Sequence, residues 1–442
     1  MLNRNDSAFQ QKLLSNFIFK LSPLFSKKLV QDVSWNLLSI VILGISGLLL
    51  NLIIGSCYGA EILGVFNQVF AIYIFASQLG SFGIYFSVLK HVAESSEDHN
   101  RCANIIIWGL LITFIFSALV TLSLFYTSNG IGKLLKSESV SKSIIYILPA
   151  LCCTGLNKSL MAAINGYRHM KIFAVAQSIR YVSIIVFLIL CVGYKIKGIA
   201  LPSVISAAEI LLFFFLILYG IKFDFFNIKS TELYWIIKHI KFGSKSFLSG
   251  TIAELNTRID VLMLGYFLSD KKVGIYSMAA LIVEGFTMLS YALRDNLNPI
   301  LAKLISKNQK KELQDLIRSS AKVWYIFISF IGIVSILLYP WFIQTFIKKP
   351  EFIYSWVPFG ILMAGYILSA GYIPINMILV QAGYPGLHTL LKIAIVLSNI
   401  ILNAILIPIA GINGAAVATA TTFVLSAIYI KVMVRRIIKI VV

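Results

Sequence analysis

The sequence predicts an all-α integral membrane protein, with twelve transmembrane helices in two parallel six-helix halves around a central cavity. Its composition, its apolar runs and its uneven distribution of charge point to this fold class. Of the 442 residues, 59% are hydrophobic and 13% are charged, whereas about 25% are charged in an average soluble protein. The mean hydropathy is +0.88. This composition excludes a disordered chain, a disulfide-rich secreted scaffold and an ordinary cytosolic enzyme.

Twelve apolar runs are long enough to form helices across a membrane, because about 20 residues cross about 30 Å of hydrocarbon. None of the runs alternates strictly between polar and apolar residues, as the strands of a membrane barrel do. The predicted spans are 33–57, 63–89, 103–126, 144–165, 173–193, 198–220, 246–268, 273–293, 323–345, 355–381, 388–409 and 412–433.

The loop charges predict that both termini are cytoplasmic. With the N-terminus inside, the inward segments hold 24 Lys and Arg residues and the outward loops hold 9, and inner loops are the ones that collect these residues. In a soluble protein, the net charge of +20 would suggest that the protein binds nucleic acid. Here it reflects the Lys and Arg residues of the cytoplasmic loops, and no nucleic-acid partner is expected. The five cysteines show no metal or redox spacing, so we expect packing roles, no cofactor and no metal beyond a monovalent cation.

The spans and loops divide the chain into five segments. They are a cytoplasmic or interfacial N-terminal segment (1–32), a first six-helix half (33–220), a cytoplasmic linker (221–245), a second six-helix half (246–433) and a basic cytoplasmic tail (434–442). An even number of spans in each half makes the halves parallel, and a duplication of this kind usually encloses a midplane site.

An internal repeat supports the two halves. Gly64-Val65-Phe66 opens the second span, and Gly274-Ile275-Tyr276 opens the eighth, 210 residues later. Two further pairs of glycine-containing motifs recur in the same order at offsets of 217 and 216 residues. Outside the spans, the basic and weakly amphipathic segment 303–318 is predicted to lie on the inner membrane surface, as is part of 10–30.

Three stretches resemble polysaccharide flippases. They are GAEILGVF at 59–66, RIDVLMLG at 258–265 followed by VGIY at 273–276, and NIILN at 399–403 followed by GINGAA at 411–416. With these motifs the chain resembles a Wzx-type O-antigen flippase of the multidrug/oligosaccharidyl-lipid/polysaccharide exporter superfamily.

The resemblance implies a transporter and not an enzyme. Its implied activity is the movement of undecaprenyl-pyrophosphate-linked oligosaccharides from the inner to the outer leaflet of the bacterial inner membrane, by alternating access. The implied product is O-antigen of lipopolysaccharide or a similar surface polysaccharide, and other polysaccharide-assembly membrane proteins are candidate partners.

Other functions compete with this interpretation. A drug/cation antiporter of the same superfamily would favour an anionic cavity in both halves. A lipid II flippase is a further alternative, but that group resembles a fourteen-span design, whereas twelve spans are predicted here. A polymerase or membrane glycosyltransferase usually needs a sizeable polar loop, whereas the longest outward loop, 127–143, has 17 residues. The chain contains no GxxxxGK[ST] motif for an ATPase, so uphill export would need an ion gradient.

Ionisable residues inside the spans mark candidate sites, because each costs about 2.5–3.5 kcal/mol on insertion scales. Lys158 and Arg180 lie at equal depth, roughly 10–12 Å from the cytoplasmic ends of the fourth and fifth spans. Equal depth on adjacent helices predicts one shared site. It is either a cationic pocket for a diphosphate or a pair of side chains that reach back to the headgroups. Glu209, near the middle of the sixth span, could carry a proton or cap a polar seam.

In the second half, Arg258 lies too deep to reach water easily, so we expect it to face the cavity or to be paired. Glu254 precedes it by four residues, which also allows a salt bridge within the helix, while Asp260 points to a nearly opposite face. Glu284, near the middle of the eighth span, could likewise carry a proton or cap a polar seam. Lys158, Arg180 and Glu209 sum to +1 in the first half, and Arg258, Glu254, Asp260 and Glu284 sum to −2 in the second, which favours an anion site in the first and a cation-coupling site in the second. The predicted substrate-binding residues are Lys158, Arg180 and Arg258.

A monovalent-cation site is predicted in the second half. Asn399 and Asn403 stack on one helix face at a spacing of four residues, and oxygen ligands suit hard cations. With Asp260, Ala415 and Thr419 they also resemble a sodium site of lipid II flippases in the superfamily. Asn403 stands where those flippases carry a second carboxylate, so H⁺ on Asp260 competes with Na⁺ as the coupling ion. The other interpretation is an interhelical hydrogen-bond network that Asp260 caps.

Overall fold

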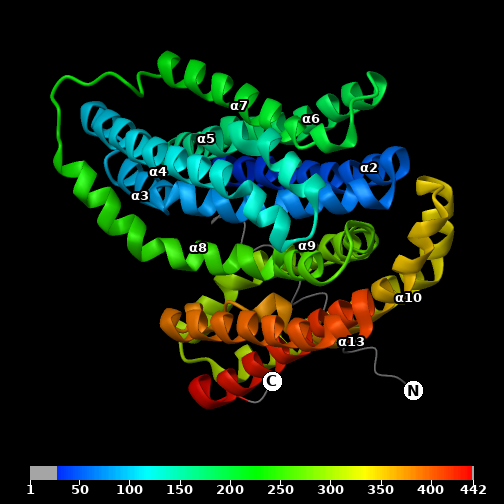
Figure 1. Cartoon of the computed structure of the whole chain (residues 1–442). Coiled ribbons are helices and arrows are strands. Elements are labelled where there is room, and N and C mark those ends of the chain that lie inside the picture. Colours follow the sequence, from blue (N-terminus) through cyan, green and yellow to red (C-terminus); the bar gives the residue numbers. More distant parts are fainter. Residues whose placement is uncertain (1–26, 441–442) are drawn as a thin grey trace.

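The computed structural model describes residues 27–440, except the side chains of residues 27–34, 36, 37, 40, 248–250 and 252–257. Every regular element within 27–440 is helical (Figure 1), which confirms the all-α class. Most of the predicted N-terminal segment 1–32 lies outside the described residues.

The long helices are α2 (Lys27–Ser81), α3 (Ile84–Glu94), α4 (His99–Leu134), α5 (Glu138–Gly166), α6 (Met170–Gly193), α7 (Ser203–Lys222), α8 (Tyr234–Phe267), α9 (Asp270–Ser306), α10 (Lys310–Phe342), α11 (Trp356–Ser369) and α13 (Pro385–Met433). The short ones are η1 (Gly198–Ala200), η2 (Ile343–Ile347), η3 (Pro350–Ser355), η4 (Ile373–Ile375), α12 (Ile378–Gln381) and η5 (Val434–Ile438).

The two longest helices, α2 and α13, each fold back on themselves at a glycine. Gly59 has φ 85° in α2 and Gly411 has φ 58° in α13, a left-handed backbone that glycine adopts without steric cost. In α2, Asn67 Nδ2 donates to Asn51 Oδ1 at 2.9 Å. These two residues stand at equal distances in sequence before and after Gly59, so the arms of α2 lie side by side.

Nine helical segments in the described part of the chain are long and apolar enough to cross a membrane, as expected for a multi-pass membrane protein. Two of them contain the folds at Gly59 and Gly411, and each of these overlaps two predicted spans. The predicted second span, 63–89, is not one helix, because α2 ends at Ser81 and α3 begins after Gly83, which has φ 68°. α8 corresponds to the predicted seventh span but is not among the nine. Twelve crossings and two cytoplasmic termini therefore stay predictions.

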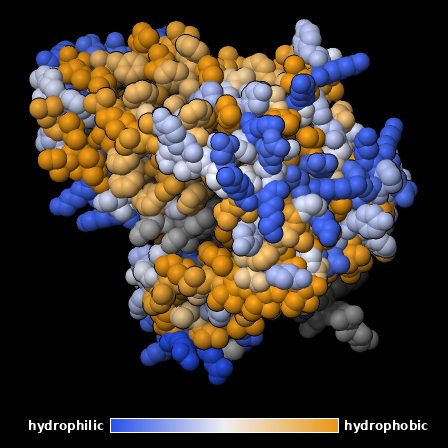
Figure 2. All heavy atoms as spheres, viewed as in Figure 1, coloured by the Kyte–Doolittle hydropathy of each residue, from blue (hydrophilic) through white to orange (hydrophobic). Residues whose placement is uncertain are grey.

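Large apolar side chains cover the flanks of the helices. Phe214 and Phe330 are 60% and 68% exposed, as lipid-facing residues would be. Figure 2 shows hydrophobic side chains over most of the upper-left and lower parts of the face in view, with hydrophilic ones gathered on the right and at the margins. Such a surface would be unstable in water and fits a hydrocarbon surrounding.

The hydrophobic core is shared at one end of the bundle and split at the other. One cluster joins both halves and includes Leu63, Val273 and Ile407. Two further clusters stay separate, one within α3 to α8 and one within α9 to α13 with the short segments beside it. In Figure 1, α2 to α7 lie above α13, and α8, which contacts α2 as well as α13, runs between them. The end with Gly59 and the α8–α9 turn is called the shared end below, and the sequence predicts that it faces outward.

The repeat-related glycines bring α2 and α9 into backbone contact at the shared end. A Cβ added to Gly64 would overlap the carbonyl of Asp270, and one added to Gly274 would overlap the carbonyl of Ala60. The two glycines thus form a reciprocal contact between the halves. A larger residue at either position would force the two helices apart.

Two acidic side chains reinforce this contact. Asp270 accepts hydrogen bonds from Gln68 Nε2 at 2.7 Å and from Ser137 Oγ at 2.6 Å. Glu351 accepts one from the backbone N–H of Ala60 at 2.8 Å and pairs with Lys271 at 2.6 Å. Each carboxylate therefore ties a residue of the first half to the second half.

One predicted span of the second half is wrong. The predicted span 355–381 is not one helix: α11 ends at Ser369, and Pro374 lies in η4 before the four residues of α12. Proline lacks the N–H that a continuous helix needs. The segment 303–318 spans the turn between α9 and α10, and its location at the inner membrane surface stays a prediction.

Replacing Gly274 with Ala is expected to open the shared end. An added methyl group in a tight contact costs about 1–3 kcal/mol, which here disfavours the approach of α2 to α9. We expect faster labelling of a Ser137→Cys reporter by a membrane-impermeant maleimide, in a variant without the five native cysteines. Gly285→Ala is the matched control, since a Cβ there meets no atom within 4 Å. Equal labelling of both variants would contradict the role of the glycine contact.

Candidate transport cavity

The first half contains a buried ion pair between Arg180 on α6 and Glu209 on α7. Arg180 Nε lies 2.8 Å from Glu209 Oε1, and the side chains are 15% and 3% exposed. Asn157 Nδ2 donates to Glu209 Oε2 at 2.8 Å, and Tyr73 donates from its hydroxyl to Oε1 at 3.4 Å. The carboxylate is therefore held by groups from α2, α5 and α6. A buried charge of this kind is tolerated because it is both paired and hydrogen-bonded.

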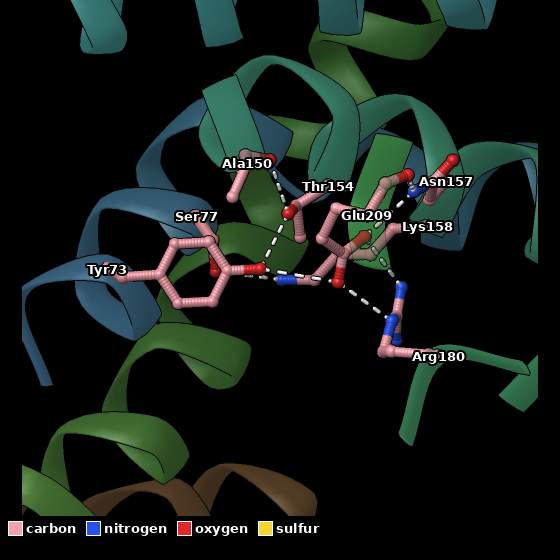
Figure 3. A network of polar contacts seen from close by, with 8 residues as sticks. All are labelled: Tyr73, Ser77, Ala150, Thr154, Asn157, Lys158, Arg180 and Glu209. Atoms are coloured by element: carbon pink, nitrogen blue, oxygen red, sulfur yellow. Dashed lines mark hydrogen bonds and ion pairs between the residues drawn. The ribbon is translucent and has the colours of Figure 1, made fainter. Parts of the chain in front are cut away.

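Lys158 lies in the same polar network, which Figure 3 shows with Arg180 and Glu209. Its ammonium donates to Ser77 Oγ at 3.3 Å and lies 5.8 Å from the centre of the Tyr85 ring. The structure thus brings the two predicted cations together and adds Glu209 as the partner of Arg180. Their role in substrate binding stays a prediction.

Arg258 on α8 pairs with Glu284 on α9. Its Nη2 lies 3.2 Å from Glu284 Oε2, and the side chains are 22% and 31% exposed. The guanidinium also lies 5.5 Å from the centre of the Phe70 ring, so it reaches the first half. The side chain of Glu254, the other predicted partner, lies outside the described residues.

Asp260 is buried between α8 and α9. Its Oδ2 accepts a hydrogen bond from the hydroxyl of Tyr276 at 2.6 Å, and its Oδ1 accepts one from the N–H of Val261 at 2.8 Å. The Tyr276 hydroxyl also lies 3.4 Å from Thr419 Oγ1 on α13. Tyr276 therefore links the carboxylate to the second arm of α13.

A cavity of about 160 Å³ opens among these helices of the second half. It is called the second-half cavity below, and polar side chains from α8, α9, α13 and the turn after η4 line it, together with Asn67 of α2. They include Arg258, Asp260, Tyr276, Glu284, Asn376, Lys392, Asn399 and Thr419. Three of the five residues predicted to couple an ion therefore share one cavity with a predicted substrate-binding residue.

The other two residues of the predicted cation site lie nearby in α13. Asn403 Nδ2 donates to Asn399 Oδ1 at 2.7 Å, and Asn403 Oδ1 is buried with no hydrogen-bond partner among the described residues. Ala415 is fully buried in the shared core. An unused amide oxygen is a suitable cation ligand, whereas the Asn399–Asn403 bond also fits the interpretation as a helix-stabilising network.

Sequence reasoning did not single out two residues of this cavity. Lys392 lies on α13 inside the predicted eleventh span, so its charge alone was a signal of the kind that pointed to Arg258. Tyr276 belongs to the repeat motif of the eighth span, but nothing in the sequence indicates that its hydroxyl bonds to Asp260.

The sequence matches two family models. Residues 29–293 match the family described as polysaccharide biosynthesis protein, and residues 248–405 match the MatE family. The first match covers more than half of the chain, and the second overlaps it and continues into the second half.

Three similar proteins illustrate these families. The probable low-salt glycan biosynthesis flippase Agl15 of Haloferax volcanii is 30% identical over 172 residues, which are 38% of this chain and 36% of that protein. The chain thus matches about a third of this relative. A MATE family multidrug resistance transporter of the MOP superfamily, solved inward-facing, has TM-score 0.76 and 13% identity over 91% of this chain and 98% of that one. The lipid II flippase MurJ, inward closed, has TM-score 0.72 and 18% identity over 92% and 87%. The two structures show the fold.

Removing Arg180 alone is expected to destabilise the protein more than removing the whole ion pair. Arg180→Met leaves the Glu209 carboxylate buried without its partner, and breaking a buried pair in this way costs about 3–5 kcal/mol. Arg180→Met combined with Glu209→Gln removes both charges and keeps a group that Asn157 can bond. Thermal unfolding of the purified protein in detergent should give a lower Tm for the single variant than for the double variant. The reverse order would contradict the pairing.

Proposed function

We propose that this chain, which belongs to the polysaccharide biosynthesis protein family, is a flippase that carries a lipid-linked glycan across the membrane. The observation that carries the proposal is the mixed lining of the second-half cavity. Arg258 and Lys392 offer positive charge to a phosphate, while Tyr276, Asn376 and Asn399 offer groups that hydrogen-bond sugar hydroxyls. A glycan linked to a lipid by a diphosphate needs both kinds of contact.

The substrate we propose is an undecaprenyl-pyrophosphate-linked oligosaccharide, such as an O-antigen repeat unit of lipopolysaccharide, in the bacterial inner membrane. Lys158, Arg180 and Arg258 are the proposed anion-binding residues. Arg180 and Arg258 are each held by a carboxylate in this conformation. Binding of the diphosphate would therefore exchange one anionic partner for another, as alternating access brings the halves into new contacts.

Asp260 is the proposed coupling residue, with Asn399, Asn403, Ala415 and Thr419 as the neutral members of a site for H⁺ or Na⁺. The buried amide oxygen of Asn403 has no hydrogen-bond partner among the described residues, which supports a cation site here. All the ligands of such a site would be oxygen atoms, which hard cations prefer. The Tyr276 hydroxyl donates a hydrogen bond to the Asp260 carboxylate. A bound ion would therefore displace this hydroxyl or bind the carboxylate beside it.

A drug/cation antiporter is the second candidate. It is favoured by Asp260 and Glu284, two carboxylates in the second-half cavity, and by the match to the MatE family. A cationic amphiphile would bind those carboxylates, but Arg258 and Lys392 line the same cavity and would repel it. This opposition favours the glycan flippase.

Deletion of the gene, followed by analysis of lipid-linked oligosaccharides, separates the two candidates. A flippase deletion should leave complete repeat units on the inner leaflet, because assembly continues while export stops. The measurement is protection of the lipid-linked sugars from a membrane-impermeant glycosidase in spheroplasts. Export of normal glycan together with increased sensitivity to cationic drugs would contradict the flippase and support the antiporter.

Asp260→Asn is expected to uncouple transport from the ion gradient. The amide keeps a similar size and can still accept from Tyr276, but it cannot bind a proton or neutralise a cation at neutral pH. Transport in proteoliposomes is measured under a sodium gradient and a pH gradient imposed separately, and we expect the accelerating gradient to lose its effect. If Asp260→Asn responds to the gradients like the wild-type protein, Asp260 is not the coupling residue.

A further inference from the structure

Three basic side chains cluster where α9 and α13 border the second-half cavity. Lys392 and Tyr291 both line it, and the Arg294 guanidinium lies 4.7 Å from the centre of the Tyr291 ring. His388 stands one helical turn before Lys392 on α13. Tyr291 thus places Arg294 beside the cavity that Lys392 lines. The cluster therefore joins two helices of the second half.

This cluster has an excess of positive charge. Arg294 bonds to Asp295 at 2.9 Å, but that carboxylate is 60% exposed, so solvent screens it. Lys392 makes no ion pair or hydrogen bond with any side chain that the structure describes, and His388 Nε2 is buried with no hydrogen-bond partner there. By contrast, Arg180 and Arg258 are already paired with carboxylates.

We propose that Arg294 and Lys392 form the docking site for the diphosphate of the substrate, an inference that rests on the proposed function. Neighbouring like charges in a partly desolvated place repel each other, and an anion between them removes that cost. The planar guanidinium of Arg294 matches two phosphate oxygens, and the Lys392 ammonium adds a point charge. The free oxygen of Asn376, in the same cavity, accepts from a hydroxyl of the first sugar.

The position of the cluster fits the first step of transport. α9 beyond Tyr291 and the start of α13 belong to the split end, where Leu301 and Leu391 form a core separate from the first half. The sequence predicts that this end faces the cytoplasm, where a lipid-linked glycan is made. The diphosphate thus docks in the second half, while the first-half cations stay engaged with Glu209 until the halves move.

The test measures binding of undecaprenyl diphosphate without sugar to the purified full-length protein in detergent, by the change in tryptophan fluorescence. Charged hydrogen bonds make a large difference to affinity, so Lys392→Met and Arg294→Met should each weaken binding at least about tenfold. Lys392→Arg should retain most of it. Lys431→Met is the matched control, because Lys431 is an exposed lysine of the same helix.

Thermal stability without ligand separates a docking role from a structural one. If Lys392 only suffers repulsion in the empty site, Lys392→Met should keep or raise the Tm while it weakens binding. A lower Tm with unchanged affinity would overturn the proposal.

Competition identifies the source of the anion: inorganic pyrophosphate should compete with undecaprenyl diphosphate, and phosphatidylglycerol should not. Equal competition by phosphatidylglycerol would make the cluster a general headgroup site and overturn the diphosphate assignment.

The outcomes also separate this inference from the proposed function. If the wild-type protein binds undecaprenyl diphosphate and neither neutral variant weakens it, the docking site is wrong and the flippase proposal stands. If the wild-type protein binds no lipid diphosphate, the docking site and the proposed substrate both fail.

Discussion

A charged side chain inside a membrane helix costs about 2.5–3.5 kcal/mol on insertion, so each one must be neutralised, hydrated or used for function. The first half neutralises Arg180 with Glu209 in a network that joins three other helices. In the second half, Glu284 neutralises Arg258, and Tyr276 satisfies Asp260. These pairings link α5, α6 and α7 with α2 in the first half, and α8 with α9 in the second. They also leave Lys392 as the cavity cation without a partner among the described residues, which is why we propose that the diphosphate docks first in the second half.

The glycine contact between α2 and α9 determines where the halves meet. Because Gly64 and Gly274 come from the two copies of the repeat, each half supplies the same surface to the contact. The hydrogen bonds of Asp270 and Glu351 act only while the helices touch. They are therefore lost together when the contact opens. A shared core at one end and separate cores at the other are what one state of an alternating-access transporter requires.

The sequence was informative wherever the signal was local. Apolar runs predicted the helices, and the turns at Gly59 and Gly411 fall between the predicted spans. Charges in the spans indicated Arg180, Arg258 and Asp260. Their partners were not predictable, because Glu209 and Glu284 lie 29 and 26 residues away on other helices. Composition alone also failed at 355–381, where a hydrophobic run concealed the break at η4.

The proposed function is the movement of a lipid-linked glycan between the leaflets of the membrane. The most direct measurement uses proteoliposomes that contain an undecaprenyl-diphosphate-linked oligosaccharide in both leaflets, and follows its cleavage by a glycosidase added outside. With the purified protein present, we expect the sugars of the inner leaflet to become accessible and cleavage to approach completion. We expect slower completion when Lys392→Met replaces the wild-type protein. Cleavage that stops at the outer-leaflet fraction, as in protein-free liposomes, under every imposed ion gradient would contradict the claim.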